Sequence, residues 1–205
     1  MRTRTGGSGR LAILVAGVTV ACGMAAAPAM GAKFGAKLTG AVNPVGASPA
    51  HKCLPASGGC TRAGVNYTAT GAVQGNVTAP DSGRIKRVRL IAATQGNFRL
   101  MVLKLNNVDL ATGTALGKAK KKGPRISYQG NGLTSKPIEH FKLKPGIRVK
   151  QGDYLGIRAR KTSTLDCRPT TVHQVLFQPP LGLGGGFVAS RAFDNCQLLV
   201  QAIIK

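Results

Sequence analysis

The chain consists of short β-type runs of alternating or aliphatic residues, each closed by Gly, Pro, Asn or Asp, and no segment carries a capped helical apolar stripe. Turn residues at such regular spacing are typical of antiparallel all-β folds, whereas a parallel α/β fold needs crossover helices. The pattern therefore predicts an antiparallel β-sandwich of about eight strands, jelly-roll-like in topology. The expected strands span residues 65–70, 84–93, 98–105, 138–143, 147–149, 154–159, 172–177 and 197–204.

Residues 1–32 have the features of a signal peptide. A positively charged start precedes the apolar run Leu11–Ala21, and small residues follow, with Ala29 and Ala32 as candidate cleavage ends. Two alternatives stay open, a retained membrane anchor and a lipid-modified Cys22. Because the apolar run is shorter than the eighteen or so residues that a membrane helix needs, we expect cleavage and a secreted, extracellular protein, free or associated with the cell surface.

The segment after the signal peptide, residues 33–62, is rich in Gly, Ala, Pro and Ser and has no periodicity. We expect it to be flexible and to end in a small loop between Cys53 and Cys60. One β-sandwich domain then spans residues 63–205.

Four cysteines follow the signal peptide, an even number in a chain expected to be exported. Proximity favours pairing Cys53 with Cys60 and Cys167 with Cys196, although two other pairings are possible. A zinc site is the functional alternative, but the chain has no Cys-x-x-Cys and no histidine within four residues of Cys60, Cys167 or Cys196. We therefore expect structural disulfides, no metal and no cofactor.

Acidic residues and histidines are scarce, with six Asp and Glu and three His in the whole chain. Asp81 and Asp153 stand next to turn residues, where Asp bonds its own backbone. A glycosidase needs two carboxylates that face one bond, and no serine-hydrolase or zinc-protease motif is present. We expect a non-catalytic protein. The alternative is a hydrolase of a cell-wall polymer that acts through Asp153 or His140.

The excess of basic residues is the unusual feature of the composition, with 29 Lys and Arg and a formal net charge of +23. Such a surface concentrates polyanions, and its binding depends strongly on salt. The expected partner is an anionic cell-envelope polymer or an acidic polysaccharide. Nucleic acid is disfavoured because binding of single strands needs aromatic residues among the basic ones, and only Tyr128 lies near the cluster Lys118–Arg125. The candidate polyanion-binding residues are Arg84, Lys86, Arg87, Arg89, Lys120, Lys121, Lys122 and Arg125.

These candidates form two groups in the sequence. The first alternates with aliphatic residues along one expected strand, and the second is expected on a loop bounded by Gly and Pro. If strands 84–93 and 154–160 turn their basic faces the same way, they form a broad positive patch. The alternative is that the charge only solvates the surface and keeps sheet edges unpaired, as in a purely structural surface protein.

Four stretches carry a resemblance to a known group: Ser82–Arg89, Phe98–Leu103, Val149–Gly156 and Leu198–Ala202. Over about residues 80–204 the chain resembles the secreted β-sandwich proteins of uncharacterised function in high-GC Gram-positive bacteria. The most specific piece is the Gly-Asp-Tyr-Leu-Gly turn. The resemblance implies the fold and an extracellular location, and it implies no catalytic residues. The chain departs from the usual pattern in its excess of lysine and its lack of tryptophan.

Overall fold

The structure is a computed structural model of the chain, which divides into two units, residues 1–30 and residues 31–205. Every described residue belongs to the second unit, so the expected signal peptide lies almost wholly outside the described residues. The structure describes residues 31–38, 53, 58–68, 76–109, 114–131, 138–160 and 167–205, without the side chains of 65–68, 167–173 and 192–196.

The described residues form eleven strands and no helix, and thus no helix that could span a membrane. The strands are β1 (Lys33–Gly35), β2 (Cys60–Thr68), β3 (Gly83–Leu90), β4 (Gly96–Asp109), β5 (Thr114–Tyr128), β6 (Glu139–Val149), β7 (Tyr154–Ala159), β8 (Cys167–Phe177), β9 (Val188–Ala189), β10 (Ala192–Leu198) and β11 (Val200–Ile204).

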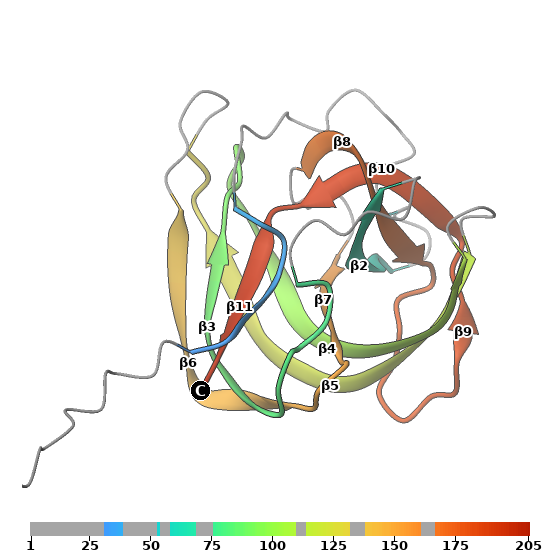
Figure 1. Ribbon diagram of the computed structural model, residues 1–205. Coiled ribbons are helices and arrows are strands. Elements are labelled where there is room, and N and C mark those ends of the chain that lie inside the picture. Colours follow the sequence, from blue (N-terminus) through green and yellow to red (C-terminus); the bar gives the residue numbers. More distant parts are fainter. Residues whose placement is uncertain are drawn as a thin grey trace, which may run out of the picture. The chain divides into compact units, whose positions relative to one another are not determined.

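The strands pair antiparallel in two sheets, in the orders β1-β11-β3-β6 and β10-β8-β2-β7-β4-β5-β9 (Figure 1). If β8, β9 and β10 are set aside, eight strands remain. The first, eighth, third and sixth of these form one sheet, and the second, seventh, fourth and fifth form the other. This is the strand order of a jelly roll. The predicted all-β antiparallel sandwich is confirmed, and the three additional strands extend the larger sheet at both of its edges.

The main core lies between the two sheets and follows from alternation along the strands. On β3, Ile85, Val88 and Leu90 are fully buried, and the consecutive residues Lys86 and Arg87 are both exposed, because the pairing with β6 shifts register between Ile85 and Arg87. Phe98, Leu100 and Val102 of β4 belong to the same buried cluster from the opposite sheet. Alternation before and after this shift, together with the shift itself, therefore places Lys86 and Arg87 on the outer face of the sheet.

A second apolar cluster covers the other face of the larger sheet. Met101 and Leu103 of β4 are buried there with Phe177 of β8 and with Leu181, which follows β8. The uninterrupted apolar run of β4 thus serves two cores, one on each face. The additional strand β8 and the segment after it provide the cover that the second face needs.

The strand β5 was not expected. Lys120–Lys122 were predicted to lie on a loop, and this prediction is wrong, because these residues lie inside a strand of 15 residues. Its pairing with β4 shifts register between Arg99 and Met101 and again between Val102 and Leu103. These two irregularities let consecutive lysines stay exposed within a strand, a pattern that strict alternation does not predict.

The boundaries of the domain also differ from the expected ones. Residues 33–35 of the segment expected to be flexible form β1, which pairs with β11 and buries Phe34, and β2 begins at Cys60 rather than after residue 62. Three residues are too few to show an alternating pattern, so β1 has no recognisable signal in the sequence. Residues 39–52 and 54–57 lie outside the described residues.

The end of the chain belongs to two sheets rather than to one strand. The run expected as a single strand over 197–204 is divided at Leu199 between β10 in the larger sheet and β11 in the smaller one. The run carries no turn residue at Leu199, so its sequence pattern does not distinguish one strand from two that cross between sheets.

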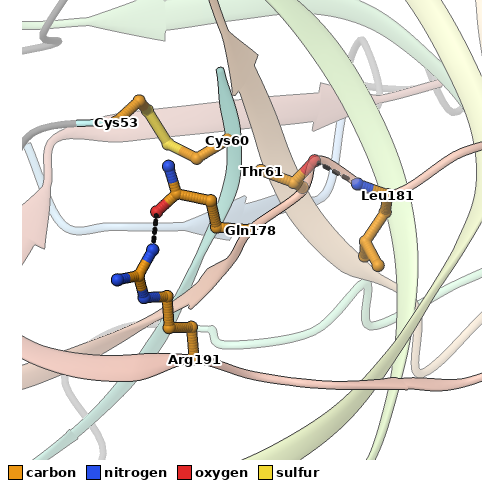
Figure 2. The surroundings of a disulfide bond; sticks show 6 residues. All are labelled: Cys53, Cys60, Thr61, Gln178, Leu181 and Arg191. Atoms are coloured by element: carbon orange, nitrogen blue, oxygen red, sulfur yellow. Dashed lines mark hydrogen bonds between the residues drawn. A yellow bond between two sulfur atoms is a disulfide. The ribbon is translucent and has the colours of Figure 1, made fainter. Parts of the chain in front are cut away.

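The predicted Cys53–Cys60 disulfide is confirmed, with the two Cα atoms 5.2 Å apart (Figure 2). Both cysteines are buried with Ala159 and Leu176. The backbones of Cys167 and Cys196 lie on the paired strands β8 and β10, where Cys167 is opposite Leu198 and Cys196 is opposite Pro169. Their side chains lie outside the described part, so this second pairing stays a prediction.

Candidate functional site

Three arginines form a row across three neighbouring strands of the larger sheet. Arg99 of β4 lies opposite Arg125 of β5 on one side and opposite Arg158 of β7 on the other. Directly opposite residues in antiparallel strands project from the same face, with Cβ atoms about 5 Å apart. The sheet therefore holds three guanidinium groups next to one another on one face.

The row forms at this point because of alternation on β4 and the register shift on β5. Phe98 and Leu100 are buried on the core side, so Arg99 between them projects from the opposite face. Its guanidinium Nη1 donates a hydrogen bond to the Gly123 carbonyl oxygen at 3.2 Å, which fixes the side chain along β5. That bond uses one donor of the guanidinium. Because its acceptor is an uncharged carbonyl oxygen, the bond does not neutralise the positive charge of Arg99.

A pocket of about 120 Å³ lies at this row. Five of the described residues that line it are Lys or Arg, the sixth is Asn97, and none is acidic. The basic lining residues are Arg99, Lys122, Arg125, Arg158 and Arg160.

A larger groove of about 540 Å³ lies between β5 of one sheet and β6 of the other. The Arg84 guanidinium crosses toward β6 and donates from Nη1 to the Gly146 carbonyl oxygen at 2.9 Å. Among the described residues of its lining, no side chain is acidic. The basic lining residues are Arg84, Lys121, Lys122, Lys144 and Arg148.

Lys122 lines both the pocket and the groove, so the two hollows adjoin. We call their nine basic residues together the basic seam. It consists of Arg84, Arg99, Lys121, Lys122, Arg125, Lys144, Arg148, Arg158 and Arg160.

Four of the predicted polyanion-binding residues belong to the basic seam: Arg84, Lys121, Lys122 and Arg125. The structure brings these four together from β3 and β5, which belong to different sheets. The expected strands 84–93 and 154–160, whose basic faces were candidates for one broad patch, also belong to different sheets. Their basic residues are joined instead through β5, because Lys122 lies in both hollows.

The other candidates on β3 lie outside the two hollows, on the outer face of the smaller sheet. There Arg87 is opposite Lys142 and Arg89 is opposite His140 of β6. The Arg89 Nη1 donates to the Gln201 side-chain oxygen at 3.2 Å. Lys86 is exposed at the register shift between Ile85 and Arg87. These residues extend the positive surface without forming a hollow.

Lys120, the remaining candidate, is in an ion pair. Its Nζ lies 2.5 Å from Oδ1 of Asp153, whose side chain is 5% exposed. The other carboxylate oxygen accepts the backbone N–H of Lys150 at 2.9 Å, which is the turn role expected for this aspartate. Lys120 therefore serves to hold the β6–β7 turn against β5.

Comparison of the chain with protein-family models, with curated proteins and with solved structures finds no match.

Arg99 and Arg158 were not among the predicted polyanion-binding residues, although both line the pocket. Arg99 stands alone among apolar residues, so it carries no local charge signal. Its importance comes from strand pairing, which joins residues far apart in the chain. Arg158 and Arg160 lie on the expected basic strand 154–160, but the sequence does not show which strands pair with it.

The residues proposed for catalysis do not converge. His140 is exposed near the start of β6, and Asp153 follows the end of that strand. An extended strand of this length separates its ends by about 30 Å. His51 and the side chain of His173 lie outside the described part. Within that part, no three His, Cys, Asp or Glu residues cluster as metal ligands would.

The basic seam can hold anionic groups in two ways. Guanidinium groups match the oxygen atoms of phosphate and carboxylate with paired hydrogen bonds, and the lysines add mobile point charges. The pocket has the size of one small anionic group, and the adjoining groove is open to a longer ligand.

Proposed function

We propose that this protein is a secreted, non-catalytic binding module for an anionic polymer of the cell envelope, and that the basic seam is its binding surface. The observation that carries the proposal is the row of Arg125, Arg99 and Arg158 at the pocket. Like charges placed directly opposite across a sheet destabilise the folded protein. An anionic ligand offsets that repulsion, so the arrangement favours binding.

A polymer fits the basic seam better than a single small anion does. The pocket and the groove share Lys122, so one chain with repeated negative charges reaches both. Binding of one charged group then raises the effective concentration of the next at the neighbouring hollow. A monomeric anion gains only one of the two sets of contacts.

The seam contains more arginine than lysine, which favours ligands with well-ordered oxygen pairs. Phosphate and carboxylate polymers both meet this requirement. The shared chemistry is therefore a repeated oxyanion, and binding experiments with one polymer of each kind distinguish the two.

The alternative of a cell-wall hydrolase has less support. Asp153 forms an ion pair with Lys120 and accepts a hydrogen bond from the backbone N–H of Lys150, and His140 lies at the other end of β6. Neither residue lines the pocket or the groove.

The test measures binding of the purified protein to isolated cell walls, to poly(glycerol phosphate) and to polygalacturonate over a series of salt concentrations. The seam variant Lys122→Gln with Arg125→Gln removes two exposed charges, and Lys33→Gln with Lys104→Gln removes two exposed charges elsewhere. We expect the seam variant to lose at least about tenfold in affinity and to show a shallower salt dependence, by roughly one unit of slope per lost contact.

The control variant has the same net charge, so it reports the general electrostatic effect alone. We expect it to lose less than about threefold. Equal losses in the two variants, or no binding of any of the three ligands, would contradict the proposal and favour a purely structural protein.

A further inference from the structure

The segment between β8 and β9 exposes large apolar side chains. Leu183 is 54% exposed, Phe187 is 41% exposed and Val188 is 44% exposed. In the described part of the chain, these are the exposed large hydrophobic residues, and all three lie within residues 182–188. We call this segment the apolar loop. Scattered exposed apolar residues are ordinary, but a group of three on one short loop indicates an interaction site.

The base of the apolar loop is fixed to the sandwich at its first end. The Leu181 N–H donates to Oγ1 of the buried Thr61 at 3.0 Å, and Leu181 itself is buried (Figure 2). The contact lies beside the disulfide, since Thr61 follows Cys60 in β2. Thus the loop leaves a rigid part of the fold.

The second end is fixed as well. The Ser190 N–H donates to the Ala115 carbonyl oxygen at 2.7 Å, and the Ala115 N–H donates back to Ser190 Oγ at 2.9 Å. The Arg191 guanidinium donates to the Gln178 side-chain oxygen at 3.0 Å, which closes the two ends on each other (Figure 2).

Between these ends the loop touches β5, where Leu183 bridges Ala119 and Val188 pairs with Gly117, but the glycines at its tip face open space. A Cβ atom added at Gly182, Gly184 or Gly186 would meet no atom within 4 Å, and one at Gly185 would meet only the Gly182 carbonyl oxygen at 3.7 Å. The apolar side chains are therefore exposed on a loop whose backbone is held against β5. This geometry suits insertion into a soft apolar phase better than packing in a groove of the protein itself.

Lysines lie next to this tip. The Lys118 Nζ lies 6.0 Å from the centre of the Phe187 ring, and Lys118 is directly opposite Lys104 on β4. A second copy of the chain would bring the same net charge of +23, which repels association. A surface of anionic lipids instead offers phosphates to the lysines and an acyl region to the apolar side chains.

We propose that the apolar loop inserts into the surface of an anionic lipid bilayer, with Leu183, Phe187 and Val188 in the interface and Lys104 and Lys118 at the headgroups. This inference does not depend on the polymer-binding function, because the loop and the basic seam share no residue. It adds a second contact with the envelope.

The absence of tryptophan from the chain makes a direct test possible. Phe187→Trp keeps the loop apolar and introduces a single tryptophan, whose emission reports its surroundings. The protein is titrated with vesicles of equimolar phosphatidylglycerol and phosphatidylcholine, with vesicles of phosphatidylcholine alone, and with brominated lipids. A second reporter, Ser127→Trp, places the tryptophan at an exposed position beside the basic pocket, opposite Asn97.

We expect the emission of the Phe187→Trp protein to shift to shorter wavelength and to be quenched by brominated lipid in anionic vesicles, with little change on neutral ones. Adding Leu183→Ser should lower the vesicle partition coefficient at least about tenfold. Gly182→Ser adds a hydroxyl group in open space on the same loop and should change it less than about twofold.

Four results would overturn the inference. The first is no co-sedimentation with anionic vesicles. The second is co-sedimentation in which only the Ser127→Trp reporter shifts, because the basic seam alone would then bind. The third is an equal shift on neutral vesicles. The fourth is a shift that appears with rising protein concentration without lipid, which would assign the loop to contact between copies of the chain.

Discussion

Arg99 and Arg125 lie directly opposite each other on β4 and β5, and Arg158 of β7 lies opposite Arg99 on the other side of β4. Repulsion between such residues opposes folding, typically by a few tenths of a kcal/mol to about 1 kcal/mol per pair. The same repulsion makes the pocket attractive to an anion. The three arginines therefore lower the stability of the folded protein and raise its affinity for an anion.

Arg125→Gln should separate these two effects. We expect the free energy of unfolding to stay unchanged or to rise by up to about 0.5 kcal/mol, while affinity for the anionic polymer falls several-fold. Urea unfolding and binding at two salt concentrations measure the two quantities. Lys104→Gln relieves a like-charged pair with Lys118 away from the pocket, and it should leave polymer affinity nearly unchanged. A fall in stability of Arg125→Gln would contradict the repulsion.

Asp153→Asn removes the charge that Lys120 pairs with and keeps an oxygen that can accept from the Lys150 N–H. Because Asp153 is 4% exposed, we expect a loss of about 1–3 kcal/mol in the free energy of unfolding. Asp81→Asn, at an exposed turn position, makes the same chemical change and should cost less than about 0.5 kcal/mol. Equal effects of the two substitutions in urea unfolding would argue against a structural role for the ion pair.

Gly117→Ala should destabilise the second core. A Cβ atom there would lie 2.2 Å from Cζ of Phe177, which packs across β5 from β8. Since the ring is buried, it cannot move away freely, and overpacking of this kind costs about 1–3 kcal/mol. Gly182→Ala meets no neighbour and is the matched control, without a loss of similar size. Thermal unfolding of the two variants compares them directly, and a melting temperature for Gly117→Ala equal to that of the parent would show that the ring can adapt.

Replacing both Cys53 and Cys60 by Ala should lower the free energy of unfolding by about 2–3 kcal/mol, the value expected for closing so short a loop. Both side chains are buried, so alanine keeps the site apolar and isolates the effect of the bond. Urea unfolding with and without a reducing agent provides the comparison. If the reductant destabilises the double variant as much as the parent, the contribution comes from other cysteines.

Our proposal that the chain is exported predicts a mature protein that begins at Met30, after cleavage at Ala29. Cleavage after Ala32 would remove a residue whose carbonyl oxygen accepts the Ile204 N–H at 2.8 Å, and it would also remove Gly31, which lies against the Ile204 carbonyl oxygen. Intact mass and N-terminal sequencing of the secreted protein decide between these ends. A chain that begins at Lys33 would contradict this prediction, and one that begins at a modified Cys22 would show lipidation.

Alternation and turn residues predicted the fold class because both are local properties of a strand. The alternation of Val88, Arg89 and Leu90 along β3 places Val88 and Leu90 in the core, whereas the burial of Ile85 in the same core also needs the register shift after it. The Cys53–Cys60 bond was predictable for the same reason, since a short loop brings its ends together without help from the rest of the fold. Strand β5 was not predictable in this way, because its lysines, Gly123 and Pro124 are poor local signals for a strand.

The sequence by itself determined the class of fold, the disulfide between Cys53 and Cys60, and the presence of a large positive charge. Only the tertiary structure decided where that charge gathers. Arg99, Arg125 and Arg158 come from three separate strands, and the register between strands, which depends on packing of both cores, sets them side by side. Lys122 joins pocket and groove because the two sheets meet beside β5. Such contacts between residues distant in the chain carry no local pattern, so they appear only once the strands have paired.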